Sequence, residues 1–153
     1  MRDPVLSTAE RAFLAEARRA VLATIAPDGR PRLVPICFVL DPTRPVLYTP
    51  LDEKPKSMDE PHRLARVQDL LADPRVSVLV DRWSEDWTRL AWLRCRGAAT
   101  LLEPDAEAAD VHSSGVRMLR AKYPQYESHR LETRPLIRIA IEYATSWGAL
   151  DTD

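Results

Sequence analysis

Apolar residues alternate with polar ones over several short stretches, and this period of two predicts strands. Residues 21–25 and 32–40 form two such stretches, joined by the turn sequence Pro27-Asp28-Gly29-Arg30. A proline-containing turn at residues 41–45 leads to a third strand at 46–49. Three strands in series favour an antiparallel meander.

Three segments have apolar residues at helical spacing instead. Ser7-Thr8-Ala9-Glu10 is a capping box that begins a helix over residues 7–17. A second helix covers 63–71, and a third runs from a cap at Asp105 to Tyr123. Further strands are expected at 76–80, 91–103 and 136–143. The pattern predicts a mainly β protein, a small six-stranded antiparallel barrel with helices outside.

Size and charge limit the classes of function. The 153 residues are 45% hydrophobic, which suits one domain spanning 1–153. A net charge of -1 gives no overall attraction for nucleic acid or an anionic membrane. No apolar run approaches the roughly 20 residues that span a bilayer, and the first residues lack the pattern of a secretory signal. We expect a soluble cytoplasmic protein.

Common catalytic and metal motifs are missing from the sequence. Cys37 and Cys95 lie in apolar segments and are expected to be buried thiols, and the three histidines form no metal-binding pattern. Glycine-rich phosphate-binding motifs do not occur either, since the chain has four glycines. Any phosphate must therefore be held by side chains.

Basic residues cluster after the third strand. Lys54 and Lys56 are two of the chain's three lysines, and Arg63 and Arg66 follow at helical spacing. One interpretation is a solvated surface, neutralised by the four acidic residues of this stretch. The other is an anion site, because two lysines in a loop and two arginines near a helix start can converge on one phosphate.

Two further features leave alternatives open. Pro35 cannot donate a ladder hydrogen bond, so its strand needs an edge, a bulge or a ligand beside it. Trp83, Trp87 and Trp92 lie within ten residues. They fit an aromatic core or an interface, and the alternative is stacking on a flat ring.

The order of short motifs resembles one superfamily over nearly the whole chain. The motifs are Ala23-Thr24-Ile25, Asp28-Gly29-Arg30-Pro31, Val34-Pro35-Ile36, Leu47-Tyr48-Thr49, Lys54-Pro55-Lys56, Asp73-Pro74-Arg75-Val76, Asp86-Trp87 and Arg96-Gly97-Ala98-Ala99. Together they resemble the flavin and deazaflavin split barrels typified by pyridoxamine 5'-phosphate oxidase. Within that superfamily the chain is most similar to the branch of oxidoreductases that use the deazaflavin F420.

The resemblance implies a cofactor site with no catalytic side chain and no metal. The backbone of Val34, Pro35 and Ile36 would meet the edge of the ring system, and Tyr48 and Thr49 would line the ribityl and phosphate side. Lys54 and Lys56 would hold phosphate, helped by Arg66 and, nearby, by Arg63 and Gln68. Asp69 stands where many relatives carry Asn, and an acid there would weaken an anion site unless it faces away.

The implied function is hydride transfer between reduced F420 and an unidentified small organic acceptor. Two alternatives remain: an FMN-dependent oxidase or reductase of the pyridoxamine 5'-phosphate oxidase type, and a non-catalytic carrier of the same cofactors. F420 has a carboxylate-rich tail beyond its phosphate, for which His62 and Arg63 are further candidate cations. The family also implies a homodimer with cofactor sites between its subunits.

Overall fold

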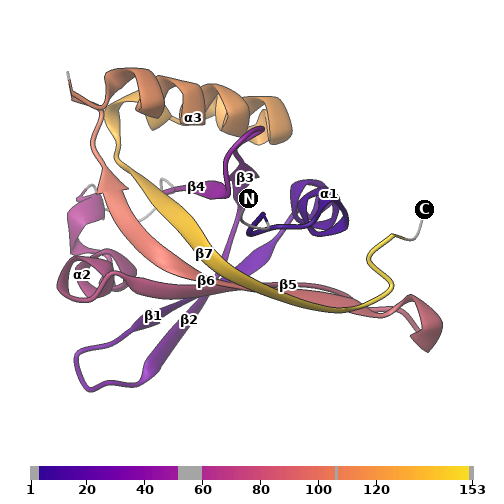
Figure 1. Cartoon of the computed structure of the whole chain (residues 1–153). Coiled ribbons are helices and arrows are strands. Elements are labelled where there is room, and N and C mark those ends of the chain that lie inside the picture. Colours follow the sequence, from indigo (N-terminus) through magenta and orange to yellow (C-terminus); the bar gives the residue numbers. More distant parts are fainter. Residues whose placement is uncertain (1–3, 52–59, 106, 152–153) are drawn as a thin grey trace.

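The computed structural model describes residues 4–51, 60–105 and 107–151, and in these residues seven strands form one antiparallel sheet (Figure 1). The strand order is β2-β1-β5-β6-β7-β4-β3. The strands are β1 (Ala20–Ile25), β2 (Pro31–Ile36), β3 (Val39–Leu40), β4 (Val46–Pro50), β5 (Arg75–Arg82), β6 (Ala91–Leu102) and β7 (Leu136–Gly148). The α-helices are α1 (Thr8–Glu16), α2 (Ala65–Ala72) and α3 (Ala109–Lys122), with short 3-10 turns at Pro61–Arg63, Trp87–Arg89, Pro124–Ser128 and Leu131–Thr133.

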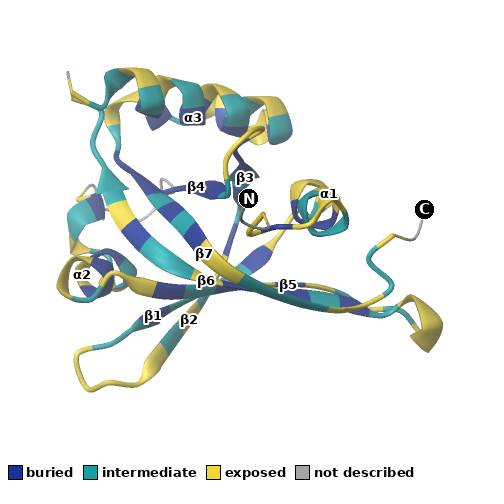
Figure 2. Ribbon diagram, viewed as in Figure 1, coloured by how far each residue is buried: buried dark blue, intermediate teal, exposed yellow. Residues whose placement is uncertain are grey.

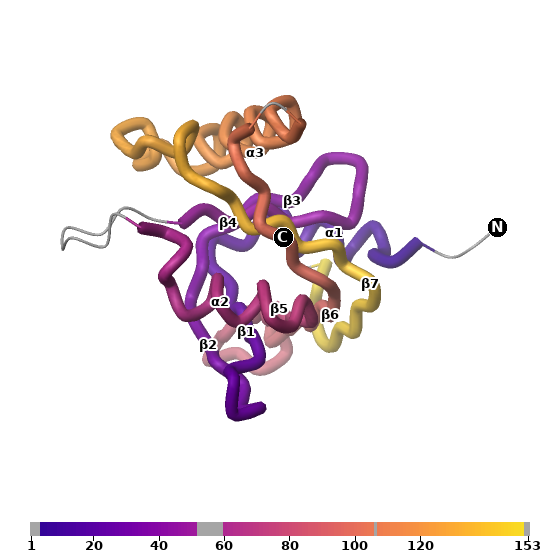
Figure 3. The backbone as a smooth tube through the Cα atoms, turned by 90° about the vertical axis from the view of Figure 1, so that its left-hand side faces the viewer, coloured from indigo at the N-terminus to yellow at the C-terminus, as the bar shows by residue number. Residues whose placement is uncertain are grey.

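The two edge strands determine the shape of the sheet. β2 and β3 lie at opposite ends of the strand order, yet only Cys37 and Phe38 separate them in the chain. Two residues span less than about 8 Å. The sheet therefore curls until its edges approach each other, as the end-on view shows (Figure 3). The expected split barrel is confirmed.

The sheet has seven strands where six were expected, because the predicted strand over residues 32–40 is interrupted. Thr49 Oγ1 donates to the Cys37 carbonyl at 2.7 Å, and the Phe38 N–H donates to the Tyr123 hydroxyl at 3.2 Å. That hydroxyl in turn donates to the Arg18 carbonyl at 2.9 Å. The Cys37 carbonyl and the Phe38 N–H thus have partners outside the ladder, which lets the chain turn from one edge to the other.

Two hydrophobic clusters fill the fold. The larger lies between the sheet, α1 and α2, and the smaller lies under α3, where Tyr48, Val116 and Leu119 pack together. Figure 2 shows α3 buried on the side that faces the sheet and exposed on its outer side. At the β6–β7 bulge, a Cβ on Gly97 would meet the Ala140 carbonyl oxygen at 2.0 Å, so this close crossing requires glycine.

The local sequence signal is confirmed at α1 and wrong at α3. Ser7 and Glu10 exchange both hydrogen bonds of the capping box, at 3.0 and 2.9 Å. The residue before α3 is Ala108, which gives no side-chain cap, and Asp105 instead accepts from the N–H groups of Glu107 and Ala108 in the preceding turn. Of the helices in the described ranges, none has the length and apolar content needed to cross a membrane.

The cysteines and tryptophans depart in part from expectation. Cys95 is buried, which raises the pKa of its thiol to about 12, whereas Cys37 is only partly buried. Trp83, Trp87 and Trp147 expose 65%, 71% and 54% of their surface. Of the tryptophans within residues 83–92, Trp92 is half-buried, so a core role is wrong for Trp83 and Trp87 only, and an interface role stays a prediction.

Replacing Tyr123 with Phe removes the hydroxyl that satisfies the Phe38 N–H. We expect the free energy of unfolding to fall by about 1–3 kcal/mol, since a buried donor is left unpaired. Urea denaturation measures this change. Tyr143→Phe is the control, because Tyr143 is exposed, and it should change stability by less than about 0.5 kcal/mol. Equal stability of both variants would contradict the proposed role of the hydroxyl.

Candidate functional site

The outer edge of β2 is the first part of the candidate site. In the described sheet β2 pairs only with β1, so one side of its backbone has no partner strand. Pro35 lies opposite Val21 on this edge strand, which confirms the edge predicted from its missing N–H. Val34 is half-buried, Pro35 is exposed and Ile36 is buried. The strand can present backbone groups to a ligand, as the resemblance implies.

The end of β4 lies next to this edge but directs its side chains inward. Tyr48 is 1% exposed and packs in the cluster under α3. The Thr49 hydroxyl already donates to the Cys37 carbonyl. A ligand could meet the backbone here more readily than either side chain, and the cofactor roles of these two residues stay predictions.

A buried carboxylate joins α2 to the β1–β2 hairpin. Asp69 Oδ2 accepts from Arg32 Nε at 2.7 Å and from Thr24 Oγ1 at 2.8 Å. Burial by itself raises the pKa of Asp69, but the hydrogen bonds from Arg32 and Thr24 outweigh it and hold the pKa below its ordinary value. Asp69 is therefore ionised and paired with Arg32, so it places no unpaired negative charge in the anion site.

Asp69→Asn tests this pairing through acid unfolding. The lowered pKa means that the carboxylate stabilises the fold above its ordinary pKa of 3.8, and that this contribution is lost as pH falls through the folded-state value. We expect the variant to be less stable at neutral pH and to lose less stability on acidification. Denaturant midpoints across the acid range measure both effects. Parallel curves for the two proteins would contradict the pairing.

The start of α2 carries the candidate phosphate ligands that the structure describes. Arg63 is exposed and Arg66 is half-buried. Gln68 Nε2 donates to the His62 carbonyl at 2.5 Å, so Gln68 fixes the backbone that leads into the helix. Leu64 precedes the helix without a side-chain cap, and an uncapped helix start favours an anion beside it. Lys54 and Lys56 lie outside the described residues.

His62 is held between two carboxylates. Its Nδ1 is 2.6 Å from Glu60 Oε1 and its Nε2 is 2.6 Å from Glu103 Oε1. Carboxylates only accept hydrogen bonds, so both short contacts require an imidazolium. The hydrogen bond to Glu103, and then that to Glu60, raises the pKa of His62. His62 is thus already neutralised, which leaves Arg63 as the better candidate for a carboxylate tail.

Nuclear magnetic resonance titration of His62 checks this arrangement. Its imidazolium stabilises the segment fully below the ordinary pKa of 6.5, and the effect is lost as pH rises through the higher folded-state pKa. We expect Glu103→Gln to lower the titration midpoint, since the first of the two partners loses its charge. Glu107→Gln, an exposed change, should leave the midpoint unchanged. A His62 titration midpoint at or below 6.5 in the unmodified chain would contradict the placement of His62 between two charged carboxylates.

Two arginines near the site had no signal in the sequence. Arg32 is brought to α2 by Asp69, and Arg134 Nε donates to the carbonyl of Leu51 at 3.3 Å. Leu51 is fully buried and immediately precedes the segment that carries the two lysines. Arg134 is therefore a further candidate cation beside Leu51, where that segment begins.

A groove of about 430 Å³ lies between the β1–β2 turn and α2. Ile25, Pro27, Gln68 and Asp69 are among its lining residues. The groove thus adjoins the second half of α2, and no residue of β2 lines it.

The family model described as pyridoxamine 5'-phosphate oxidase matches residues 6–148. The chain belongs to this family. Among curated proteins, no sequence matches it.

Solved structures agree with the family on the fold. A conserved hypothetical protein of Mycobacterium tuberculosis has a TM-score of 0.72 at 22% identity, covering 97% of this chain and 88% of that one. The heme storage protein HutZ of Vibrio cholerae has a TM-score of 0.68 at 18% identity, covering 97% and 95%. A structure described as F420 reductase has a TM-score of 0.61 at 19% identity, covering 88% and 94%. At these identities the likeness concerns the fold.

Proposed function

We propose that this member of the pyridoxamine 5'-phosphate oxidase family is an oxidoreductase that uses F420 and transfers a hydride between the reduced cofactor and a small organic acceptor. One observation carries the proposal: the Arg32–Asp69 ion pair holds the open edge of β2 against the helix that begins with the candidate phosphate ligands. The ring edge and the phosphate would therefore be bound by two elements fixed to each other.

The residues of the chain have binding and orienting roles in this proposal. The bound deazaflavin supplies the hydride. Backbone groups of residues 34–36 would fix the ring edge, and N–H donors there would favour its anionic form. Lys54, Lys56, Arg63, Arg66 and Arg134 supply positive charge for the phosphate, and Gln68 holds the backbone at the helix start. No side chain needs to react.

The choice of F420 rests on the resemblance and on the exposed Arg63. FMN ends at its phosphate, whereas F420 continues into a carboxylate-rich tail that needs space and further cations. The exposed Arg63 suits such a tail, whereas the groove of about 430 Å³ is lined by Asp69 and Asp73 and by no cation. The similarity to the structure described as F420 reductase supports the same choice.

Two other functions follow from the same site. The family description supports an FMN-dependent oxidase or reductase. The similarity to HutZ supports a non-catalytic carrier, since HutZ is described as a heme storage protein. Both alternatives keep the fold and the anion site.

Paired fluorescence titrations with F420 and FMN test the proposal. We expect F420 to bind more tightly. Lys54→Ala combined with Lys56→Ala should weaken its binding by about 2–4 kcal/mol, since two charge-assisted bonds are lost. Arg19→Ala is the control, because Arg19 is exposed on the segment between α1 and β1. FMN binding at least about tenfold tighter than F420 would overturn the cofactor choice.

We further propose that the chain forms a homodimer through the outer face of β5, β6 and β7. Leu79, Tyr143 and Trp147 are exposed there. Trp92 and Trp147 are cross-strand neighbours, and Arg94 and Arg96 lie between the apolar side chains, over the rings of Trp92 and Tyr143. A face on which exposed aromatic side chains and arginines alternate is typical of an interface.

Sedimentation velocity tests the dimer at micromolar concentration. The unmodified chain should sediment at about twice the chain mass of 17.4 kDa. Trp147→Ala should shift it towards the monomer, because the change removes a large exposed aromatic side chain from the proposed interface. Arg19→Glu should leave the mass unchanged. A monomer that binds cofactor with full affinity would contradict both the dimer and the site between subunits.

A further inference from the structure

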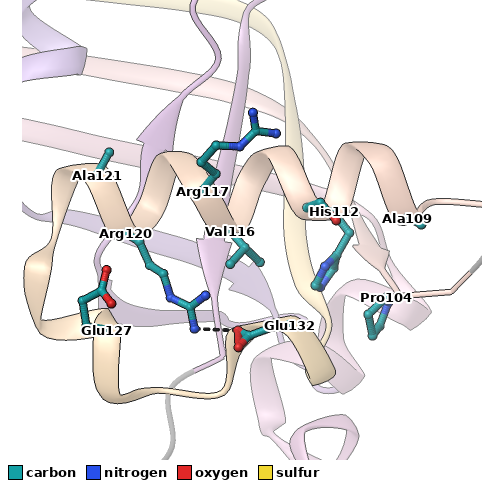
Figure 4. Close-up of a pocket in the computed structure, with 10 residues that line it drawn as sticks. Pro104, Ala109, His112, Val116, Arg117, Arg120, Ala121, Glu127 and Glu132 are labelled. Atoms are coloured by element: carbon teal, nitrogen blue, oxygen red, sulfur yellow. Dashed lines mark hydrogen bonds and ion pairs between the residues drawn. The ribbon is translucent and has the colours of Figure 1, made fainter.

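A cavity of about 540 Å³ lies between α3 and the connection that leads from it to β7 (Figure 4). Of the described residues that line it, none belongs to β2, β4 or α2, so the cavity is separate from the proposed cofactor site. Its volume is within the usual range of small-molecule pockets, roughly 300–1,000 Å³. The two ends of the cavity carry different groups.

The end of the cavity beside Glu127 and Glu132 is polar, and its main charges are already paired. Arg120 pairs with Glu132 at 2.5 Å and donates to the Tyr126 carbonyl at 3.1 Å. Arg117 rises from the opposite side of α3 and points away from the acidic wall (Figure 4). The described cations at this end are therefore not available to an anionic ligand.

The other end of the cavity is mostly apolar and contains His112. Pro104, Ala109 and Val116 line the cavity beside this histidine (Figure 4). His112 is 2% exposed, and its Nε2 lies 2.6 Å from the Arg134 carbonyl. A carbonyl oxygen can only accept, so Nε2 carries the hydrogen, and Nδ1 of the neutral ring keeps a lone pair.

This lone pair distinguishes His112 from the other buried polar residues in the described part of the chain, which are Thr24, Asp41, Thr49 and Asp69. The hydroxyl or carboxylate of each of these four residues has a hydrogen-bond partner within the protein. In His112 one ring nitrogen is paired, and no residue of the described ranges donates to the other. A ligand N–H or O–H in the cavity would satisfy this buried acceptor.

We propose that the His112 end of the cavity binds a neutral, largely apolar molecule with one N–H or O–H donor, a class that indole represents. The donor bonds Nδ1 of His112, and the ring packs on Val116, Ala109 and Pro104. A charged ligand is disfavoured, because its charge would lose water without gaining a partner at this end. The site does not depend on the proposed cofactor site, so either can fail without the other.

Calorimetric titration of the full chain with indole tests the site against two comparison molecules. 1-Methylindole keeps the ring and lacks the N–H, whereas L-tryptophan keeps the N–H and adds two charges. Indole should bind saturably, and each comparison molecule should bind at least about tenfold more weakly. Equal binding of 1-methylindole would overturn the donor assignment, and equal binding of tryptophan would overturn the preference for a neutral ligand. No saturable binding of indole up to about 5 mM would disprove the site.

The nitrogen resonances of the His112 ring report the hydrogen bond directly. In the free protein Nδ1 should be the unprotonated nitrogen of the ring. Saturating indole should shift the Nδ1 resonance, because a hydrogen bond then forms at its lone pair, and 1-methylindole should shift it less. A protonated Nδ1 in the free protein, or an Nδ1 resonance that bound indole leaves unchanged, would contradict the proposed contact.

Two matched substitutions show which end of the cavity indole occupies. Ala109 and Ala121 both line the cavity, in the first and last turns of α3, and lie at opposite ends of it (Figure 4). Ala109→Leu should weaken indole binding at least about tenfold, because the larger side chain fills space beside His112, whereas Ala121→Leu should leave binding unchanged. Leucine is a good helix former, so both variants should keep α3. Weaker binding in Ala121→Leu alone, or unchanged binding in Ala109→Leu, would overturn the placement at the His112 end.

Discussion

The Tyr123 hydroxyl fixes the point at which the sheet changes from one edge to the other. β2 and β3 end the strand order on opposite sides, so the two residues between them must leave the ladder without leaving polar groups unpaired. Tyr123 and Thr49 supply the missing partners. The curl of the sheet, and with it the two hydrophobic clusters, depends on this crossing.

The same crossing explains why β2 has an open edge at all. After two residues β2 continues into β3, which lies at the opposite edge of the same sheet. β2 therefore cannot also pair with β3 along its length. An unpaired edge is usually a liability, since it invites pairing with other chains. Here Pro35 removes one donor from it, and the Arg32–Asp69 pair brings α2 alongside. The edge is thus kept open beside a helix start, which is an arrangement suited to a planar ligand with an anionic tail.

Features with local causes could be predicted from the sequence, and features with distant partners could not. The capping box at Ser7 and the edge signalled by Pro35 depend on neighbours in the chain, and both are confirmed. Tyr123 bonds Phe38 across 85 positions and Arg134 bonds Leu51 across 83. β7 also continues to Gly148, beyond the expected end at residue 143, because β6 pairs with it there although residues 144–146 have no apolar alternation. Such contacts follow from the topology and leave no periodic pattern.

The charges around α2 bear on how a ligand with several negative groups would lie. His62 with Glu60 and Glu103 forms a cluster of net charge -1 while the imidazolium persists, and of -2 when it is neutral. A carboxylate-rich tail is repelled by this cluster near neutral pH, and more strongly as the pH rises through the pKa of His62. Arg63, next in the chain and exposed, attracts it. The tail of a deazaflavin would therefore be expected to pass on the Arg63 side of the helix start, whereas FMN, which ends at its phosphate, has no such tail to place.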